Sequence, residues 1–151
     1  MAGLEIVDVT VDDGEWVLSL FRANKDVWPG GGSQEWWRYT HRSPTDRQRW
    51  VKVLVGGDRA GFAHWHRRLV EWANLYEIAV DARYRRAGVG RALVAYIGPP
   101  IVLKTRVDRQ ANGFYERLGF RHLGTETSRN GRMTFNKFAI GEIAATQPSL
   151  L

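Results

Sequence analysis

Hydrophobic and polar residues alternate along several segments of the chain, and this alternation is typical of β-strands. It predicts strands over residues 4–11, 49–55, 60–67, 69–80, 101–107, 120–125 and 133–140. Gly56, Gly57 and Asp58 separate the second strand from the third, and this composition predicts a tight hairpin turn. Asn130 and Gly131 predict the turn of a last hairpin between the final two strands.

Apolar residues recur at helical spacing in the segments between these strands. They predict helices around residues 16–21, 33–39, 88–96 and 108–118. Asp12 and Asp13 are candidate caps of the first helix, and Gly98-Pro99-Pro100 and Gly119 end the last two. The order of elements predicts one α/β (α+β) domain, with a single mixed, mostly antiparallel sheet flanked by helices.

The length of 151 residues, or 17.3 kDa, suits one compact domain over residues 1–151. No apolar run approaches the roughly 20 residues that span a bilayer, and the first residues do not resemble a secretory signal. With no cysteine, the chain has no disulfide, thiolate nucleophile or zinc–thiolate site. We therefore expect a cytoplasmic protein without a bound metal.

The net charge of +6 is unevenly distributed along the chain. Residues 1–82 hold 10 Lys and Arg against 12 Asp and Glu, whereas residues 83–151 hold 12 against 4. This asymmetry predicts that the C-terminal half meets an anion. A nucleic acid is the less favoured partner, because no nucleic-acid-binding motif accompanies the positive charge.

The segment after residue 80 combines glycines and arginines at the start of a predicted helix. Arg85, Arg86, Gly88, Gly90 and Arg91 lie where a strand runs into that helix. Main-chain N–H groups at a helix N-terminus lack internal partners and bind phosphate, and glycine lets an anion approach the backbone closely. Residues 85–91 are thus a candidate diphosphate site, although a tightly packed turn would use the same glycines.

Two motifs here resemble the GCN5-related N-acetyltransferase (GNAT) family. Residues 85–90, Arg-Arg-Ala-Gly-Val-Gly, match that family's Arg/Gln-x-x-Gly-x-Gly/Ala loop, and residues 78–81 match the strand before it. Residues 108–120 are similar to its second signature, Asn-x-x-Ala-x-x-Phe-Tyr-Glu-x-x-Gly-Phe, with Asp108 in place of the usual Asn. The resemblance covers nearly the whole chain and implies the acyl-CoA N-acyltransferase fold.

The resemblance also implies an N-acetyltransferase that moves an acetyl group from acetyl-CoA to a primary amine by direct attack in a ternary complex. Main-chain groups of Ile78 and Val80 would hold the pantetheine arm. Within this picture, residues 1–70 form the acceptor side and residues 71–140 bind acetyl-CoA. The remaining implied contacts with acetyl-CoA are Arg85, Arg86, Ala87, Gly88, Val89, Gly90, Arg91, Asp108, Asn112 and Tyr115.

By the same resemblance, Tyr115 is the acid that protonates the departing thiolate, unless it only packs in the core. The general base is open. The resembling enzymes often carry glutamate where this chain has Asn74 and Tyr76, and strand alternation turns Glu77 to the opposite face unless a β-bulge intervenes. Glu77 remains a candidate base, and the alternatives are Glu71, His64, His66 and a water relay.

Acidic and aromatic residues in the N-terminal half would suit a cationic amine. They are Asp12, Asp13, Asp26 and Glu35, with Trp16, Trp28, Trp36, Trp37 and Trp50, although Trp16 and Trp50 are better explained as core. The amine itself, whether a small metabolite, an antibiotic or a protein amine, is open. A homodimer is a reasonable expectation, and a non-catalytic acyl-CoA sensor is the alternative function.

Overall fold

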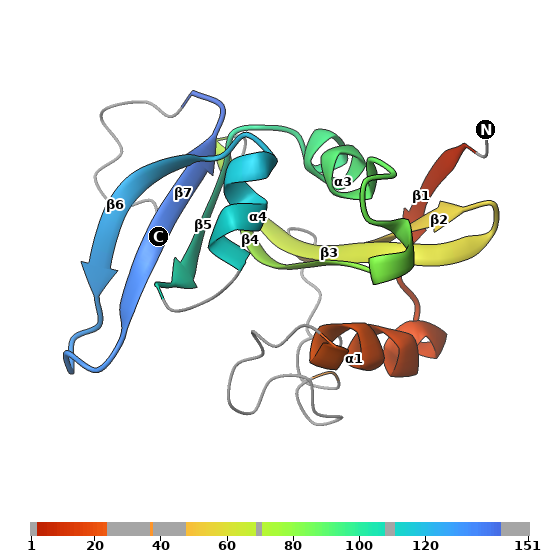
Figure 1. Ribbon diagram of the computed structural model, residues 1–151, viewed down its shortest axis with the longest axis horizontal. Helices are drawn as coiled ribbons and strands as arrows, with labels where there is room; N and C mark the ends of the chain where they lie inside the picture. The colour runs from red at the N-terminus through yellow and green to blue at the C-terminus, as the bar shows by residue number, and fades with distance from the viewer. Residues whose placement is uncertain (1–2, 24–36, 38–47, 69–70, 108–110, 143–151) are drawn as a thin grey trace.

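A computed structural model describes residues 3–23, 37, 48–68, 71–107 and 111–142 (Figure 1). The chain begins with β1 (Leu4–Asp8), a 3-10 helix (Val11–Asp13) and α1 (Gly14–Ala23). Three long strands follow: β2 (Gln48–Val55), β3 (Asp58–Arg68) and β4 (Trp72–Val80). The rest comprises a 3-10 helix (Ala82–Tyr84), α3 (Val89–Ile97), β5 (Ile101–Arg106), α4 (Ala111–Arg117), β6 (Arg121–Thr127) and β7 (Thr134–Ile140). The predicted order of elements is confirmed over the described residues.

The strands form one seven-stranded sheet in the order β1-β2-β3-β4-β5-β7-β6. All neighbours are antiparallel except β4 and β5, which are parallel. These two strands pair only at Ala73 with Ile101 and at Asn74 with Val102, and they diverge from there (Figure 1). The mixed, mostly antiparallel sheet predicted from the sequence is therefore confirmed.

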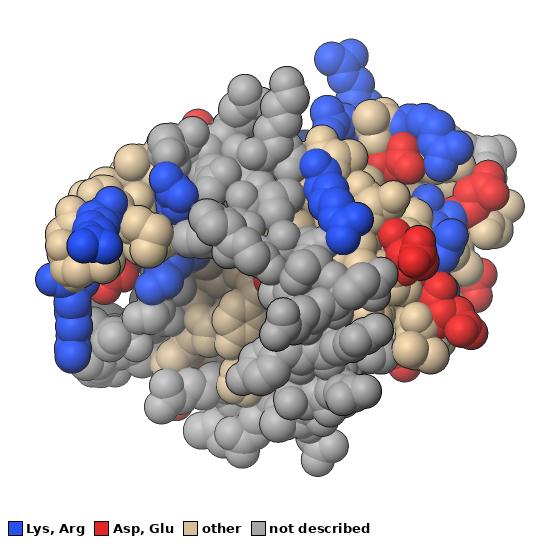
Figure 2. Space-filling model, turned by 90° about the horizontal axis from the view of Figure 1, so that it is seen from below, with Lys and Arg blue, Asp and Glu red and all other residues tan. Residues whose placement is uncertain are grey.

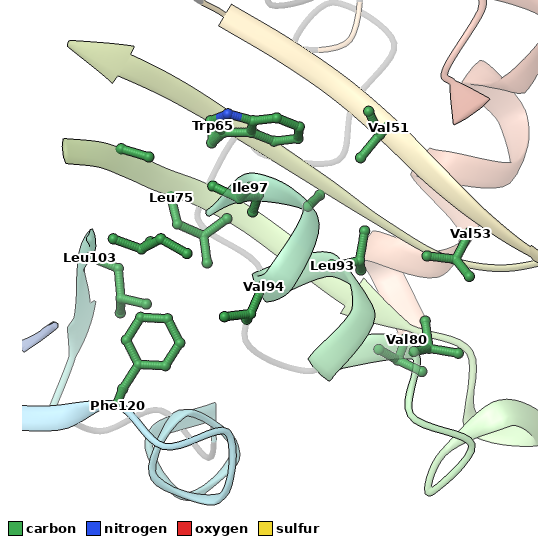
Figure 3. Close-up of a cluster of buried hydrophobic side chains, with 14 of the residues drawn as sticks. Val51, Val53, Trp65, Leu75, Val80, Leu93, Val94, Ile97, Leu103 and Phe120 are labelled. Atoms are coloured by element: carbon green, nitrogen blue, oxygen red, sulfur yellow. The ribbon is translucent and has the colours of Figure 1, made fainter. Parts of the chain in front are cut away.

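Helices cover both faces of the sheet, with α1 on one face and α3 and α4 on the other (Figure 1). The face under α3 carries the larger core, in which Leu93, Val94 and Ile97 point at the strands (Figure 3). The face under α1 carries a second core that includes Leu18, Trp50 and Phe62. Strand alternation separates the two cores, because neighbouring side chains of β3 point to opposite faces.

Glycines end and begin elements where the sequence predicts turns. Gly56 and Gly57 connect β2 to β3 with φ angles of 58° and 89°, which any other residue would adopt at a cost. Gly98, with φ 84°, ends α3 before the two prolines. The side chain of Arg67 donates to the carbonyls of Ile97 and Gly98 at 2.6 and 2.5 Å, so a strand residue satisfies the end of this helix.

Asp13 anchors the start of α1 to the sheet. Its buried carboxylate accepts from Lys52 Nζ at 2.7 Å, from Arg59 Nη1 at 3.2 Å and from the Thr10 amide at 2.8 Å. Burial alone raises the pKa of Asp13, but these hydrogen bonds outweigh burial and lower it. The negative charge of Asp13 is thus compensated inside the fold by Lys52 and Arg59, so this residue of the expected acidic group is already paired.

Candidate active site

The turn before α3 leaves a row of main-chain N–H groups without a backbone hydrogen bond. Gly88, with φ 83°, precedes the helix, and Arg86 also has a positive φ of 69°. The backbone hydrogen bonds of this turn are made by the amides of Arg85, Ala87 and Ala92. Within the described part of the chain, the amides of Arg86, Gly88, Val89, Gly90 and Arg91 make no backbone hydrogen bond, and we call this group the amide cradle. The cradle can donate several hydrogen bonds to an anion.

The two glycines of the cradle have different roles. A Cβ at Gly88 would meet no atom within 4 Å, so this residue provides positive φ and an open approach to the backbone. A Cβ at Gly90 would lie 3.2 Å from Leu118 Cδ2 and 3.5 Å from Phe114 Cζ. Gly90 therefore lets α3 pack closely against α4 and the turn after it. Tight packing therefore explains Gly90, whereas an anion that approaches the backbone at Gly88 stays a prediction.

Arginines surround the cradle, and they differ in their partners. Arg83 pairs with Asp81, and its hydrogen bonds lower the pKa of that carboxyl group. Arg85, Arg86 and Arg91 are exposed, and none of them forms an ion pair within the described ranges. Three cations thus remain available to an anion at the cradle.

On the face opposite α3, the charged side chains at the end that carries β6 and β7 are mostly lysine and arginine (Figure 2). Basic and acidic side chains are mixed at the other end, near β1 and α1. The charge asymmetry along the sequence therefore also appears in space.

The edge of β4 beyond Asn74 is free of β5. The Asp81 amide donates to the Ala60 carbonyl of β3 at 2.8 Å. Because main-chain groups of a strand alternate in direction, those of Ala79 also point to β3, whereas those of Ile78 and Val80 point away from it. The two residues that the sequence predicts as main-chain partners thus present their N–H and C=O groups on the side where β5 has diverged.

A β-bulge in β4 changes how Glu77 lies relative to the residues before it in the strand. Trp65 pairs with Leu75 and His64 pairs with Glu77, so Tyr76 is an extra residue on β4. Glu77 consequently lies on the same face as Tyr76, the face that α1 covers. The prediction from the sequence allowed Glu77 this face only if β4 contained a β-bulge, and the structure contains one.

Glu77 and His64 form a close pair on that face. Nδ1 of His64 lies 2.5 Å from Oε2 of Glu77, and the two side chains are 5% and 15% exposed. The His64 ring stacks on Trp50, with ring centroids 4.1 Å apart and an interplanar angle of 8°. The ring of Tyr76 also lies beside this imidazole, with ring centroids 5.2 Å apart. Burial and the nearby Glu77 raise the pKa of the Tyr76 phenol, so this side chain stays neutral.

Tyr115 lies on α4, on the opposite face of the sheet from Glu77. Its ring contacts Phe114, Phe120 and Phe138 at centroid distances of 5.5, 5.9 and 5.8 Å. The ring is thus part of the core under α3 and α4, as the packing alternative expects. The role of Tyr115 as an acid stays a prediction.

The other residues singled out from the sequence lie in different surroundings. Trp50 and Trp37 are buried and Trp16 packs edge-to-face on Phe62, so the core interpretation of Trp16 and Trp50 is confirmed. His66 lies opposite Asn74 on the face of His64, and Glu71 is exposed before β4. Asn112 is part of α4. Asp26, Trp28, Glu35, Trp36 and Asp108 lie outside the described residues.

The sequence-based prediction gave His64 and Glu77 as separate candidates for the base and did not include their pairing. The available signal was the hairpin between residues 60 and 80, whose register brings the two positions opposite each other. That register includes the extra residue Tyr76, which no local pattern marks.

The family model of the acetyltransferase (GNAT) domain matches residues 46–122, just over half of the chain. The chain belongs to the GNAT acetyltransferase family. The matched segment of this GNAT protein holds β2 to β5, the amide cradle, Glu77 and Tyr115. No curated protein sequence matches the chain.

Solved structures of other acetyltransferases have the same fold. The ribosomal-protein-S18-alanine N-acetyltransferase of Escherichia coli is 21% identical, with a TM-score of 0.67 over 99% of this chain and 100% of that one. Ard1 from Thermoplasma volcanium is 21% identical, with a TM-score of 0.68 over 92% and 99%. The PaiA N-acetyltransferase of Thermoplasma acidophilum, solved in complex with coenzyme A, is 16% identical, with a TM-score of 0.61 over 91% and 99%.

The described residues lack two features. None of their helices is long and apolar enough to cross a membrane. No group of three or more His, Asp or Glu side chains among them is arranged to hold a metal ion.

Proposed function

We propose that this GNAT protein is an N-acetyltransferase that moves the acetyl group of acetyl-CoA to a primary amine by direct attack in a ternary complex. The observation that carries the proposal is the amide cradle, which follows β4 after a short 3-10 helix; the edge of β4 is free of β5 beyond Asn74. A ligand with an extended polar arm could lie along that edge and place a diphosphate group at the cradle. Coenzyme A is such a molecule, and the relative from Thermoplasma acidophilum was solved with it.

The diphosphate is held by the amides of the cradle, with Arg85, Arg86 and Arg91 adding charge-assisted hydrogen bonds. The pantetheine arm lies along β4 and bonds the main-chain groups of Ile78 and Val80, as an added strand would. Ala87 contributes through its position in the turn rather than its amide, which donates to the Tyr84 carbonyl at 3.2 Å. Asp108 and Asn112 remain proposed contacts of acetyl-CoA.

The reaction needs one base and one acid. The amine nitrogen forms a bond to the thioester carbonyl carbon, and its proton passes to the carboxylate of Glu77. The C–S bond then breaks, and the departing thiolate takes the phenol proton of Tyr115. A phenol of pKa about 10 protonates a thiolate of thiol pKa about 8.5 slightly uphill, which a positioned acid tolerates. Glu77 and Tyr115 lie on opposite faces of the sheet, which suits an amine and a thioester that approach from opposite sides.

Calorimetry and a turnover assay test the proposal together. Acetyl-CoA is titrated into the protein, and release of free CoA is then followed with a panel of polyamines, amino sugars, amino acids and N-terminal peptides. The proposal expects binding of acetyl-CoA and CoA release with one class of amine, confirmed by mass spectrometry of the acetylated product. Binding without turnover on a broad panel would favour a sensor of acyl-CoA, and no binding would overturn the proposal.

A further inference from the structure

We propose that His64 is a positioning residue that holds the general base Glu77 through a hydrogen bond from Nδ1. This inference deepens the proposed function and rests on Glu77 as its base. His64 itself does not touch the substrate or take the proton. Its role follows from its pairing with Glu77, its stacking on Trp50 and the burial of its second ring nitrogen.

The surroundings of the imidazole decide which nitrogen carries the proton. Nε2 of His64 is buried and has no hydrogen-bond partner among the residues that the structure describes. If Nε2 carried the proton, a buried N–H donor would lack an acceptor, and Nδ1 would direct a lone pair at the carboxylate oxygen 2.5 Å away. If Nδ1 carries it, the ring donates to Glu77 and leaves only a bare lone pair at Nε2. We therefore assign the Nδ1–H tautomer to His64.

The ring that holds Glu77 is itself fixed. Trp50 of β2 stacks on it almost in parallel, and Phe62 in turn stacks on Trp50 at 5.7 Å. His64 belongs to β3, which pairs with long neighbours on both sides. Glu77, by contrast, follows a β-bulge, where the ladder is interrupted and strand geometry holds a side chain less firmly. A rigid donor on β3 therefore compensates for the irregular backbone of β4.

Burial indicates which member of the pair meets the amine. The side chain of Glu77 keeps 15% of its surface exposed, whereas that of His64 keeps 5% and its free nitrogen is buried. The oxygen Oε2 accepts from His64, so Oε1 is the oxygen left to take the proton from the amine. The hydrogen bond from His64 thus selects the reacting oxygen and its direction.

A double-mutant cycle separates positioning from packing. Glu77→Gln removes the base but keeps an oxygen that accepts from His64, and His64→Leu removes the donor at similar volume. His64→Leu alone should lower kcat on the order of 10²-fold, because a misplaced catalytic group costs about that much, while the KM for acetyl-CoA stays unchanged. In the Glu77→Gln background, His64→Leu should lower kcat no further, since no base remains to be positioned.

A conservative variant and a spectroscopic measurement complete the test. In His64→Asn the amide nitrogen replaces Nδ1, and this variant should recover most of the kcat that His64→Leu loses. Equal losses in both backgrounds, or an Asn variant as slow as the Leu variant, would overturn the positioning role. Independently of turnover, nitrogen-15 NMR of the imidazole should show His64 protonated at Nδ1 and bare at Nε2. The opposite tautomer would refute the inference even if acetyl-CoA binding and CoA release succeed.

Discussion

Gly61 of β3 lies against Val89, the first residue of α3. A Cβ at Gly61 would come within 2.9 Å of Val89 Cγ1 and 2.8 Å of the Ala79 carbonyl oxygen. Real side chains do not approach backbone so closely, so only glycine lets the helix start at this distance from the sheet. Because the amide cradle begins at the same helix, the backbone of β3 sets where an anion would bind.

Gly61→Ala should therefore displace the start of α3. The clash is with backbone as well as with a side chain, and overpacking of this kind costs about 1–3 kcal/mol of unfolding free energy. We also expect weaker binding of acetyl-CoA, because the cradle moves with the helix. Denaturant unfolding and calorimetry measure the two effects, and a variant with wild-type stability and affinity would show that the approach is not essential.

Gly88→Ala has a matched control in Gly57→Ala. Both glycines have positive φ, 83° and 89°, and a Cβ at either position meets no atom within 4 Å. Each variant should lose about 1–3 kcal/mol of stability, because alanine is strained at positive φ. Only Gly88→Ala should also bind acetyl-CoA less tightly, by about tenfold, the equivalent of about 1.4 kcal/mol. Equal affinities of the two variants in calorimetry would argue against a diphosphate at the cradle.

Tyr115→Phe should lower turnover without weakening acetyl-CoA binding. The ring contacts of Tyr115 with Phe114, Phe120 and Phe138 survive in phenylalanine, so the core is preserved. A positioned acid contributes about 10²–10⁴-fold to rate, and kcat should fall within this range. Steady-state kinetics with the best amine of the panel measure the change. A kcat equal to wild type would remove Tyr115 from the proposed mechanism and leave it as a core residue.

Asp13→Asn tests the anchor of α1. The pKa of Asp13 is lowered from its ordinary value of 3.8, so its stabilising effect is complete above that value and disappears as pH falls through the lower, folded-state pKa. At pH 7 the variant should lose about 1–3 kcal/mol, because Lys52 and Arg59 lose their charged partner.

The stability difference between wild type and Asp13→Asn should shrink as the solution is acidified below pH 3.8. Urea denaturation at a series of pH values measures it. A difference that stays the same throughout would mean that the ionisation of Asp13 does not stabilise the anchor.

Local patterns predicted most of the elements. The Gly56-Gly57 turn, the termination of α3 at Gly98 and the glycines after β4 all act within a few residues of chain, so the sequence shows them directly. The candidate anion site is local in the same sense, because its amides belong to one turn and one helix start. For this reason the motif at residues 85–91 and the open amides of the structure coincide.

The candidate base depended on contacts between distant segments. His64 and Glu77 are 13 residues apart, and a one-residue bulge decides whether their side chains share a face. Asp13 meets Lys52 and Arg59 through the pairing of β2 and β3 beneath α1, which no local pattern reveals.

The sequence alone therefore determined the family, the order of elements and the turn that can hold an anion, since each depends on neighbouring residues. Tertiary structure decided that Asp13 pairs with Lys52 and Arg59 and that Glu77 pairs with His64, because register and packing across the sheet are set only when the whole chain folds.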